Sequence, residues 1–150
     1  MKSGIEVGVQ EGKFAEYILQ NWTSCESYKL VDIWARQEDY RDHANVAEST
    51  NIYYESTIIR MEPFKYKVET FISGSRTEIQ KQSLDFASID ARHDYCGVYK
   101  DTEAYWPLVK PGGIMAGHDY NENSEIRGQD WGLSYNGTRN ERACSIGCCR

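Results

Sequence analysis

Three residues late in the chain are of types that do acid–base or metal chemistry. Asp90 follows one short apolar run, and His118 and Asp119 follow the next. If those runs are neighbouring parallel strands, their carboxyl ends lie side by side and the three side chains converge on one point. Such a cluster can act as a general base or hold a divalent cation such as Mg²⁺. His93 would lie at its rim, and a set of separate, solvated side chains is the alternative.

A second candidate site is the turn with the sequence EVGVQEG, in which Gly8 and Gly12 stand four residues apart. Glycines let a backbone approach a ligand closely, and the start of a helix offers unpaired N–H groups. The spacing is not that of the dinucleotide-binding fingerprint. Glu6 and Glu11 flank the turn with negative charge, which disfavours a pyrophosphate and favours a ligand with an ammonium or sulfonium group. A purely structural turn would have the same pattern.

Asp32 is a third candidate, because it ends an apolar run at a spacing from Gly8 that is typical of nucleotide-binding units. A carboxylate at this point can accept hydrogen bonds from both hydroxyls of a ribose. Trp34 follows and could lie against an adenine ring. The alternatives are a helix N-cap for Asp32 and ordinary packing for Trp34.

The apolar pattern predicts strands and helices in alternation, which would position these residues. The predicted strands are Gly4–Val9, Tyr28–Ile33, Lys67–Ile72, Leu84–Ile89 and Gly113–Gly117. The predicted helices are Glu11–Trp22, Ile52–Met61, a short one ending near Gln82, and Tyr95–Trp106. Five strands separated by helices indicate an α/β fold with a mostly parallel sheet. Such sheets bind ligands at the carboxyl ends of their strands, where the three candidate sites lie.

Length and composition narrow the class of protein further. The chain has 150 residues, one domain's worth, and a formal net charge of −6, which argues against a nucleic-acid partner. No apolar run is long enough to span a membrane, and no secretion signal is recognisable at the start. The 5 cysteines, three of them at 144, 148 and 149, are an odd number without framework spacing, so we expect a cytoplasmic protein. Residues 121–150 are atypical and are expected to form a loop or a disordered tail after a domain of residues 1–120.

Several segments together resemble a class I S-adenosylmethionine-dependent methyltransferase. They are EVGVQEG in the first strand and turn, Asp32 after the second strand, SLDFASIDARHDY around the fourth strand and VKPGGIMAGHDY around the fifth. The likeness runs in register from about Gly4 to Tyr120, and the Lys-Pro-Gly-Gly segment is its most specific signal. The chain is most similar to the small-molecule branch that includes catechol-type and macrocin-type O-methyltransferases. The fold implied is a Rossmann-like three-layer sandwich, and the cofactor is S-adenosyl-L-methionine.

The resemblance also implies roles for individual residues. Cofactor-binding roles fall on Glu6, Gly8, Gln10 and Gly12 for the methionine part, Asp32 for the ribose, Trp34, Ser73 and Ser75 for the adenine, and Asp90 for the sulfonium side. Catalytic roles fall on His118, Asp119 and Asp90, with a base expected at His118 or Asp119. In metal-using members the ligands come from the same strand ends, which here are Asp90, His118 and Asp119. His118 departs from the ligand pattern of these members, in which the position is usually acidic, because Mg²⁺ prefers oxygen ligands.

The family fold has seven strands, whereas the pattern here supports five. We therefore expect a chain that is truncated at its C-terminus, with the last two strands missing and the edge of the fifth strand covered by the tail or by a second copy of the chain. The function expected is methyl transfer to a small-molecule acceptor, most simply at oxygen. The alternative is a non-catalytic remnant that only binds S-adenosylmethionine or a protein partner. A Rossmann-like dehydrogenase is disfavoured by the missing fingerprint.

Overall fold

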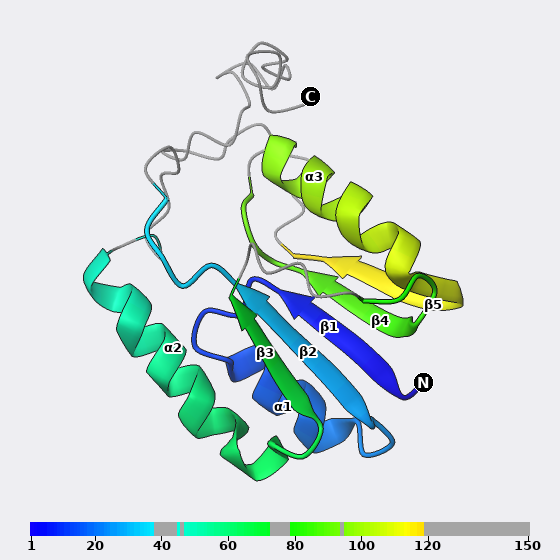
Figure 1. The fold of residues 1–150 in the computed structure, drawn as a ribbon, viewed down its shortest axis with the longest axis horizontal. Coiled ribbons are helices and arrows are strands. Elements are labelled where there is room, and N and C mark those ends of the chain that lie inside the picture. Colours follow the sequence, from blue (N-terminus) through cyan, green and yellow to red (C-terminus); the bar gives the residue numbers. More distant parts are fainter. Residues whose placement is uncertain (38–44, 46, 73–78, 94, 119–150) are drawn as a thin grey trace.

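The computed structural model describes residues 1–37, 45, 47–72, 79–93 and 95–118. Its centre is a five-stranded parallel sheet with the strand order β3-β2-β1-β4-β5 (Figure 1). The strands are β1 (Ser3–Val7), β2 (Ser27–Asp32), β3 (Val68–Ile72), β4 (Leu84–Ile89) and β5 (Val109–Gly117). The α/β fold with a parallel sheet, predicted from the apolar pattern, is thereby confirmed.

Three α-helices and two short 3-10 helices connect the strands. They are α1 (Lys13–Asn21), α2 (Ala47–Met61), η1 (Glu62–Phe64), α3 (Tyr95–Tyr105) and η2 (Trp106–Leu108). In Figure 1, α1 lies behind the sheet, α2 flanks it on the β3 side, and α3 lies in front of β4 and β5. Helices on both faces make the three layers of a Rossmann-like sandwich.

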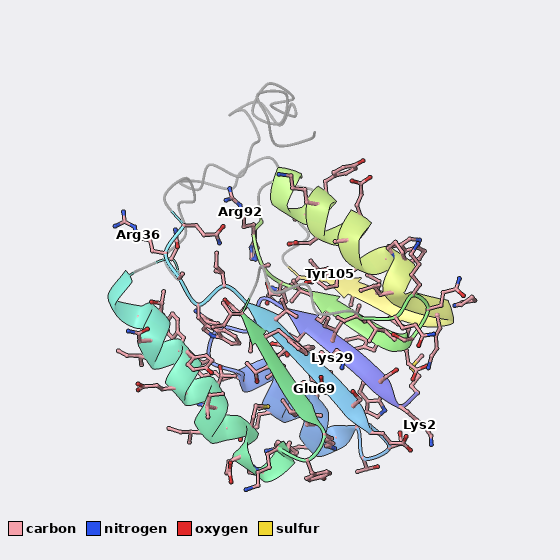
Figure 2. All side chains as sticks on the ribbon, viewed as in Figure 1. Lys2, Lys29, Arg36, Glu69, Arg92 and Tyr105 are labelled. Atoms are coloured by element: carbon pink, nitrogen blue, oxygen red, sulfur yellow. The ribbon has the colours of Figure 1, made fainter. Side chains whose placement is uncertain are left out.

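Each face of the sheet carries its own apolar core, because side chains alternate between the faces along a strand. One core is formed by Ile5, Val7, Val31, Leu84, Ala87, Ile89 and Val109. The other is formed by residues of α1, β2, the end of α2 and the turns after β1 and before β2, namely Val9, Ala15, Leu19, Cys25, Tyr28, Leu30 and Met61. The first face also carries polar residues over β2 and β3, where Lys29 Nζ donates to Glu69 Oε1 at 3.0 Å (Figure 2).

Two element predictions were wrong in detail. The helix expected to end near Gln82 is not present in residues 79–82, where Lys81 and Gln82 form a turn and Gln82 has a φ of 52°. The fifth strand begins at Val109, before the Lys-Pro-Gly-Gly segment, and this segment is therefore a bulge within the strand. The predictions for residues 121–150, and for the strands missing after β5, fall outside the described residues.

The pairing of β4 with β5 shows where the bulge lies. Leu84 pairs with Val109, and Phe86 pairs with Ile114, so Asp85 alone stands opposite residues 110–113. Lys110 Nζ donates to Asp85 Oδ1 at 2.8 Å, which anchors the bulge. Asp85 Oδ2 accepts a second bond from the backbone N–H of Ser3 at 3.0 Å. One carboxylate therefore joins β1, β4 and β5 at the end of the sheet opposite the strand ends that carry the candidate sites.

Candidate functional site

The turn after β1 packs against the backbone that directly follows β4. Gly8 has a φ of 89°, its N–H donates to the carbonyl of Val31, and the Asp90 N–H donates to the carbonyl of Val7 at 2.7 Å. A Cβ on Gly8 would lie only 2.0 Å from the carbonyl oxygen of Asp90. Glycine is therefore required here by a contact within the chain, and this contact places the turn directly beside Asp90.

Glu6 lies beneath this turn and is almost completely buried, with 2% of its surface exposed. Its Oε2 atom has no hydrogen-bond partner. Burial raises the pKa of Glu6 to about 8, and the nearby charges of Asp90 and Asp32 contribute to the rise. The Tyr28 hydroxyl lies on the same buried side and lowers this pKa slightly. At neutral pH Glu6 is therefore mostly protonated.

This burial corrects one step of the sequence argument. The two glutamates were expected to surround the turn with negative charge, but Glu6 is mostly neutral at pH 7 because burial raises its pKa to about 8. Glu11 is paired with Lys13 in an ion pair of 2.5 Å. The negative charge near the turn therefore comes from the Asp32 and Asp90 carboxylates.

Asp32 holds the backbone of the loop that follows Gly8. Its Oδ2 accepts hydrogen bonds from the N–H groups of Val9 at 2.7 Å and Gln10 at 2.9 Å. Its Oδ1 accepts one from the N–H of Trp34 at 2.8 Å. The helix N-cap alternative was wrong, because the residues after Asp32 do not begin a helix. Each carboxylate oxygen accepts up to two hydrogen bonds, so Oδ1 keeps capacity for a ligand, and the ribose role stays a prediction.

Trp34 is tied to the same loop. Its Nε1 donates to the carbonyl of Gln10 at 2.9 Å, and its ring packs edge-on against Tyr54 with the centroids 5.1 Å apart. Its φ is 36°, which is unusual for a residue other than glycine. The structure thus shows the packing role for this indole. Contact with an adenine remains a prediction, and Ser73 and Ser75 fall outside the described residues.

The strand ends of β4 and β5 bring Asp90 and His118 together. Ile89 pairs with Gly117, and the His118 N–H donates to the carbonyl of Ile89 at 3.1 Å. Asp90 Oδ1 lies 3.1 Å from Nε2 of His93 and 3.4 Å from Nδ1 of His118. His93, expected at the rim, is the less exposed of the two imidazoles, with 15% of its side chain exposed against 65% for His118. The sequence signal for this contact is the spacing of three residues between Asp90 and His93.

The loops after β2 and β4 also contact each other. Arg92 Nη1 donates to Oε1 of Gln37 at 3.2 Å. Gln37 exchanges two further hydrogen bonds with the Asn45 side-chain amide, from its N–H at 2.7 Å and to its carbonyl at 2.6 Å. Figure 2 shows Arg36 and Arg92 at the end of the molecule where these loops lie. The loops after β2 and β4 are thus joined by side-chain hydrogen bonds at this end of the sheet.

Two of the three predicted metal ligands, Asp90 and His118, lie next to each other. The third, Asp119, lies outside the described residues. In the described part of the chain, no group of three His, Cys, Asp or Glu side chains is arranged to hold a metal ion. The metal role of these residues stays a prediction.

The comparison with known families agrees with this geometry. A parallel sheet of this order, with a glycine turn and acidic residues at its carboxyl edge, is the arrangement of a Rossmann-like methyltransferase. The model of a methyltransferase domain matches residues 5–120, and the chain belongs to this family. No curated protein matches the chain. None of the helices in the described residues is long and apolar enough to cross a membrane.

Proposed function

We propose that the protein binds S-adenosyl-L-methionine at the carboxyl ends of β1, β2 and β4 and transfers its methyl group to a small-molecule acceptor, most simply at oxygen. The observation that carries this proposal is the contact of Gly8 with the backbone of Asp90, which puts the glycine turn against the carboxylate at the end of β4. A ligand on this turn would have Asp32 on one side and Asp90 on the other.

The chemistry of the turn fits the cofactor. The buried Oε2 of Glu6 lacks a hydrogen-bond partner, and a positive ligand beside it would favour its ionised form. Gly8, Gln10 and Gly12 would hold the methionine part, and Asp32 the ribose. When bound, S-adenosylmethionine supplies an electrophilic methyl group on a sulfonium. The chain's own contribution is then to align an acceptor with that methyl group and to remove the acceptor's proton.

The pair of Asp90 and His118 can perform the proton removal. With its proton on Nδ1, directed at Asp90 Oδ1, His118 carries a lone pair on Nε2 that can accept the proton of a hydroxyl acceptor. Asp90 stabilises the resulting imidazolium. His93 contacts the same carboxylate oxygen and positions it, and Asp119 is the other candidate base.

Net charge supports a small acceptor. A chain with a formal charge of −6 repels the phosphate backbone of nucleic acids, and nothing in its composition favours a membrane partner.

Within the described residues the outer edge of β5 has no strand partner, so a second copy of the chain is the partner we propose for it.

A methyl-transfer assay tests the proposal. The purified chain is incubated with S-adenosylmethionine labelled on the methyl group and a panel of catechols and sugar alcohols, with and without Mg²⁺. We expect transfer to at least one acceptor, and a loss of at least about a hundredfold in His118→Ala. The control is Tyr66→Ala, which removes an exposed ring just before β3, at the opposite end of the sheet from these strand ends. Cofactor binding without transfer to any acceptor would favour the non-catalytic alternative.

A further inference from the structure

We propose that Thr57 and Trp34 are positioning residues for the cofactor loop, because both donate hydrogen bonds to the carbonyl of Gln10. This inference rests on the proposed function for the identity of the ligand. Neither the family likeness nor the local sequence pattern pointed to Thr57.

Both donors reach the Gln10 carbonyl from outside its own loop. Thr57 Oγ1 lies 2.9 Å from this oxygen, from a position in α2 that is fully buried. Trp34 Nε1 lies 2.9 Å from the same oxygen, from the segment after β2. On the other side of the residue, the N–H of Gln10 donates to Asp32 Oδ2. Three side chains, one from α2 and two from the end of β2 and the segment after it, therefore hold one residue.

Gln10 needs this support because its backbone is in a conformation that side chains rarely adopt. Its φ is 53°, in the left-handed region that favours glycine, yet the residue is a glutamine. A residue in this region keeps its conformation only when its surroundings impose it. Without the bonds to its carbonyl, Gln10 would relax and redirect the backbone that leads to Gly12.

Thr57 also packs directly on Gly12. A Cβ on Gly12, which has a φ of 74°, would lie 3.2–3.3 Å from three atoms of Thr57. One buried side chain thus fixes the loop at Gln10 by a hydrogen bond and at Gly12 by close contact. These are the two ends of the segment that enters α1.

The hydroxyl of Thr57 is shared between two acceptors. It also lies 2.9 Å from the carbonyl of Tyr53, one turn earlier in α2. A hydroxyl has a single proton, so it donates to one carbonyl at a time. When it turns to Tyr53, the Gln10 carbonyl depends on Trp34 alone. The two donors are therefore expected to substitute for each other in part.

The test uses Thr57→Val, which removes the hydroxyl at nearly constant shape, and Thr57→Ser, which restores it. Affinity for S-adenosylmethionine is measured by calorimetry, and hydrogen exchange of the Val9 and Gln10 amides is measured without ligand. We expect Thr57→Val to weaken binding about five- to tenfold and to speed exchange of these two amides, and Thr57→Ser to match the wild type. Thr23→Val, in the turn between α1 and the start of β2 at the opposite end of the sheet from these loops, is the control and should change neither.

Trp34→Phe gives a second, independent measure because it removes the indole N–H and keeps a ring against Tyr54. The double variant with Thr57→Val leaves the Gln10 carbonyl without either donor. Its loss of affinity should exceed the product of the two single losses.

The possible outcomes are separable. Wild-type affinity and exchange in Thr57→Val would overturn the inference, and so would equal acceleration of amides throughout the sheet, which would indicate a general loss of stability. If the wild-type chain binds no S-adenosylmethionine, the proposed function fails. The exchange of the Val9 and Gln10 amides still decides whether Thr57 fixes the loop.

Discussion

At the scale of single residues, the charge and hydrogen bonding of the site's side chains depend on their surroundings as much as on their residue types. Glu6 is an acid that burial keeps neutral, and Gly8 is a glycine because the carbonyl of Asp90 lies where its Cβ would be. Asp32 is a carboxylate already engaged with three backbone N–H groups. The sequence identifies these positions, whereas their chemistry depends on neighbours that are distant in the chain.

The burial of Glu6 predicts an unusual pH dependence of stability. Its pKa is about 8 in the folded chain and near the ordinary value of 4.5 when unfolded, so the folded state binds the proton more tightly. The free energy of unfolding should therefore be greatest below pH 4.5 as far as Glu6 is concerned. It should fall by up to about 1.4 kcal/mol per pH unit up to pH 8. Urea unfolding at pH 5, 6.5 and 8 checks this, and Glu6→Gln should remove the slope; a parallel slope in the variant would contradict it.

Gly8 and Gly117 form a matched pair for substitution by alanine. At Gly8 the new Cβ meets the Asp90 backbone at 2.0 Å and the φ is 89°, whereas at Gly117 no atom lies within 4 Å of it. We expect Gly8→Ala to cost at least about 2 kcal/mol of stability and Gly117→Ala less than about 0.5 kcal/mol. Chemical denaturation of both variants measures the difference. Equal stabilities would show that the turn does not pack on β4 as described.

At the scale of elements, the apolar pattern predicted the five strands and three α-helices because each buries one face or one stripe. It did not predict the bulge in β5, since a Lys-Pro-Gly-Gly segment reads as a turn until the partner strand is known. Nor did it identify Thr57, because a buried polar residue on a helix far along the chain leaves no local signal. The contact of Asp90 with His118 could be predicted, as it requires only that two parallel strands be neighbours.

The hydrogen bonds of Asp85 at the bulge predict a pH dependence of stability. Asp85 accepts hydrogen bonds from the Lys110 ammonium and from the backbone N–H groups of Lys2 and Ser3, and these bonds hold its pKa well below the usual range. This stabilisation is present above pH 4 and is lost as the pH falls through the lowered pKa of the folded state. Asp85→Asn should cost about 1–3 kcal/mol at pH 7 and much less at pH 2. Thermal unfolding at both pH values checks this, with Glu55→Gln on the exposed face of α2 as the control; a cost that does not depend on pH would argue against it.

At the scale of the whole molecule, the fold places the candidate groups within the described residues at the carboxyl end of the sheet. The carboxyl ends of β1, β2, β4 and β5 carry the glycine turn, Asp32, Asp90 and His118, while the opposite end is anchored by Asp85. This division fits a protein that binds its ligand at the carboxyl end of the sheet. Membership of the methyltransferase-domain family indicates methyl transfer as the class of reaction.

Binding of S-adenosylmethionine at the glycine turn is tested by a calorimetric titration of the purified, folded chain with S-adenosylmethionine and with its demethylated product. We expect roughly micromolar binding of both, no binding of NAD⁺, and a loss of at least about tenfold in Asp32→Ala. Absence of binding to a chain that unfolds cooperatively would show that the turn is not a cofactor site, and binding of NAD⁺ in its place would show a different cofactor.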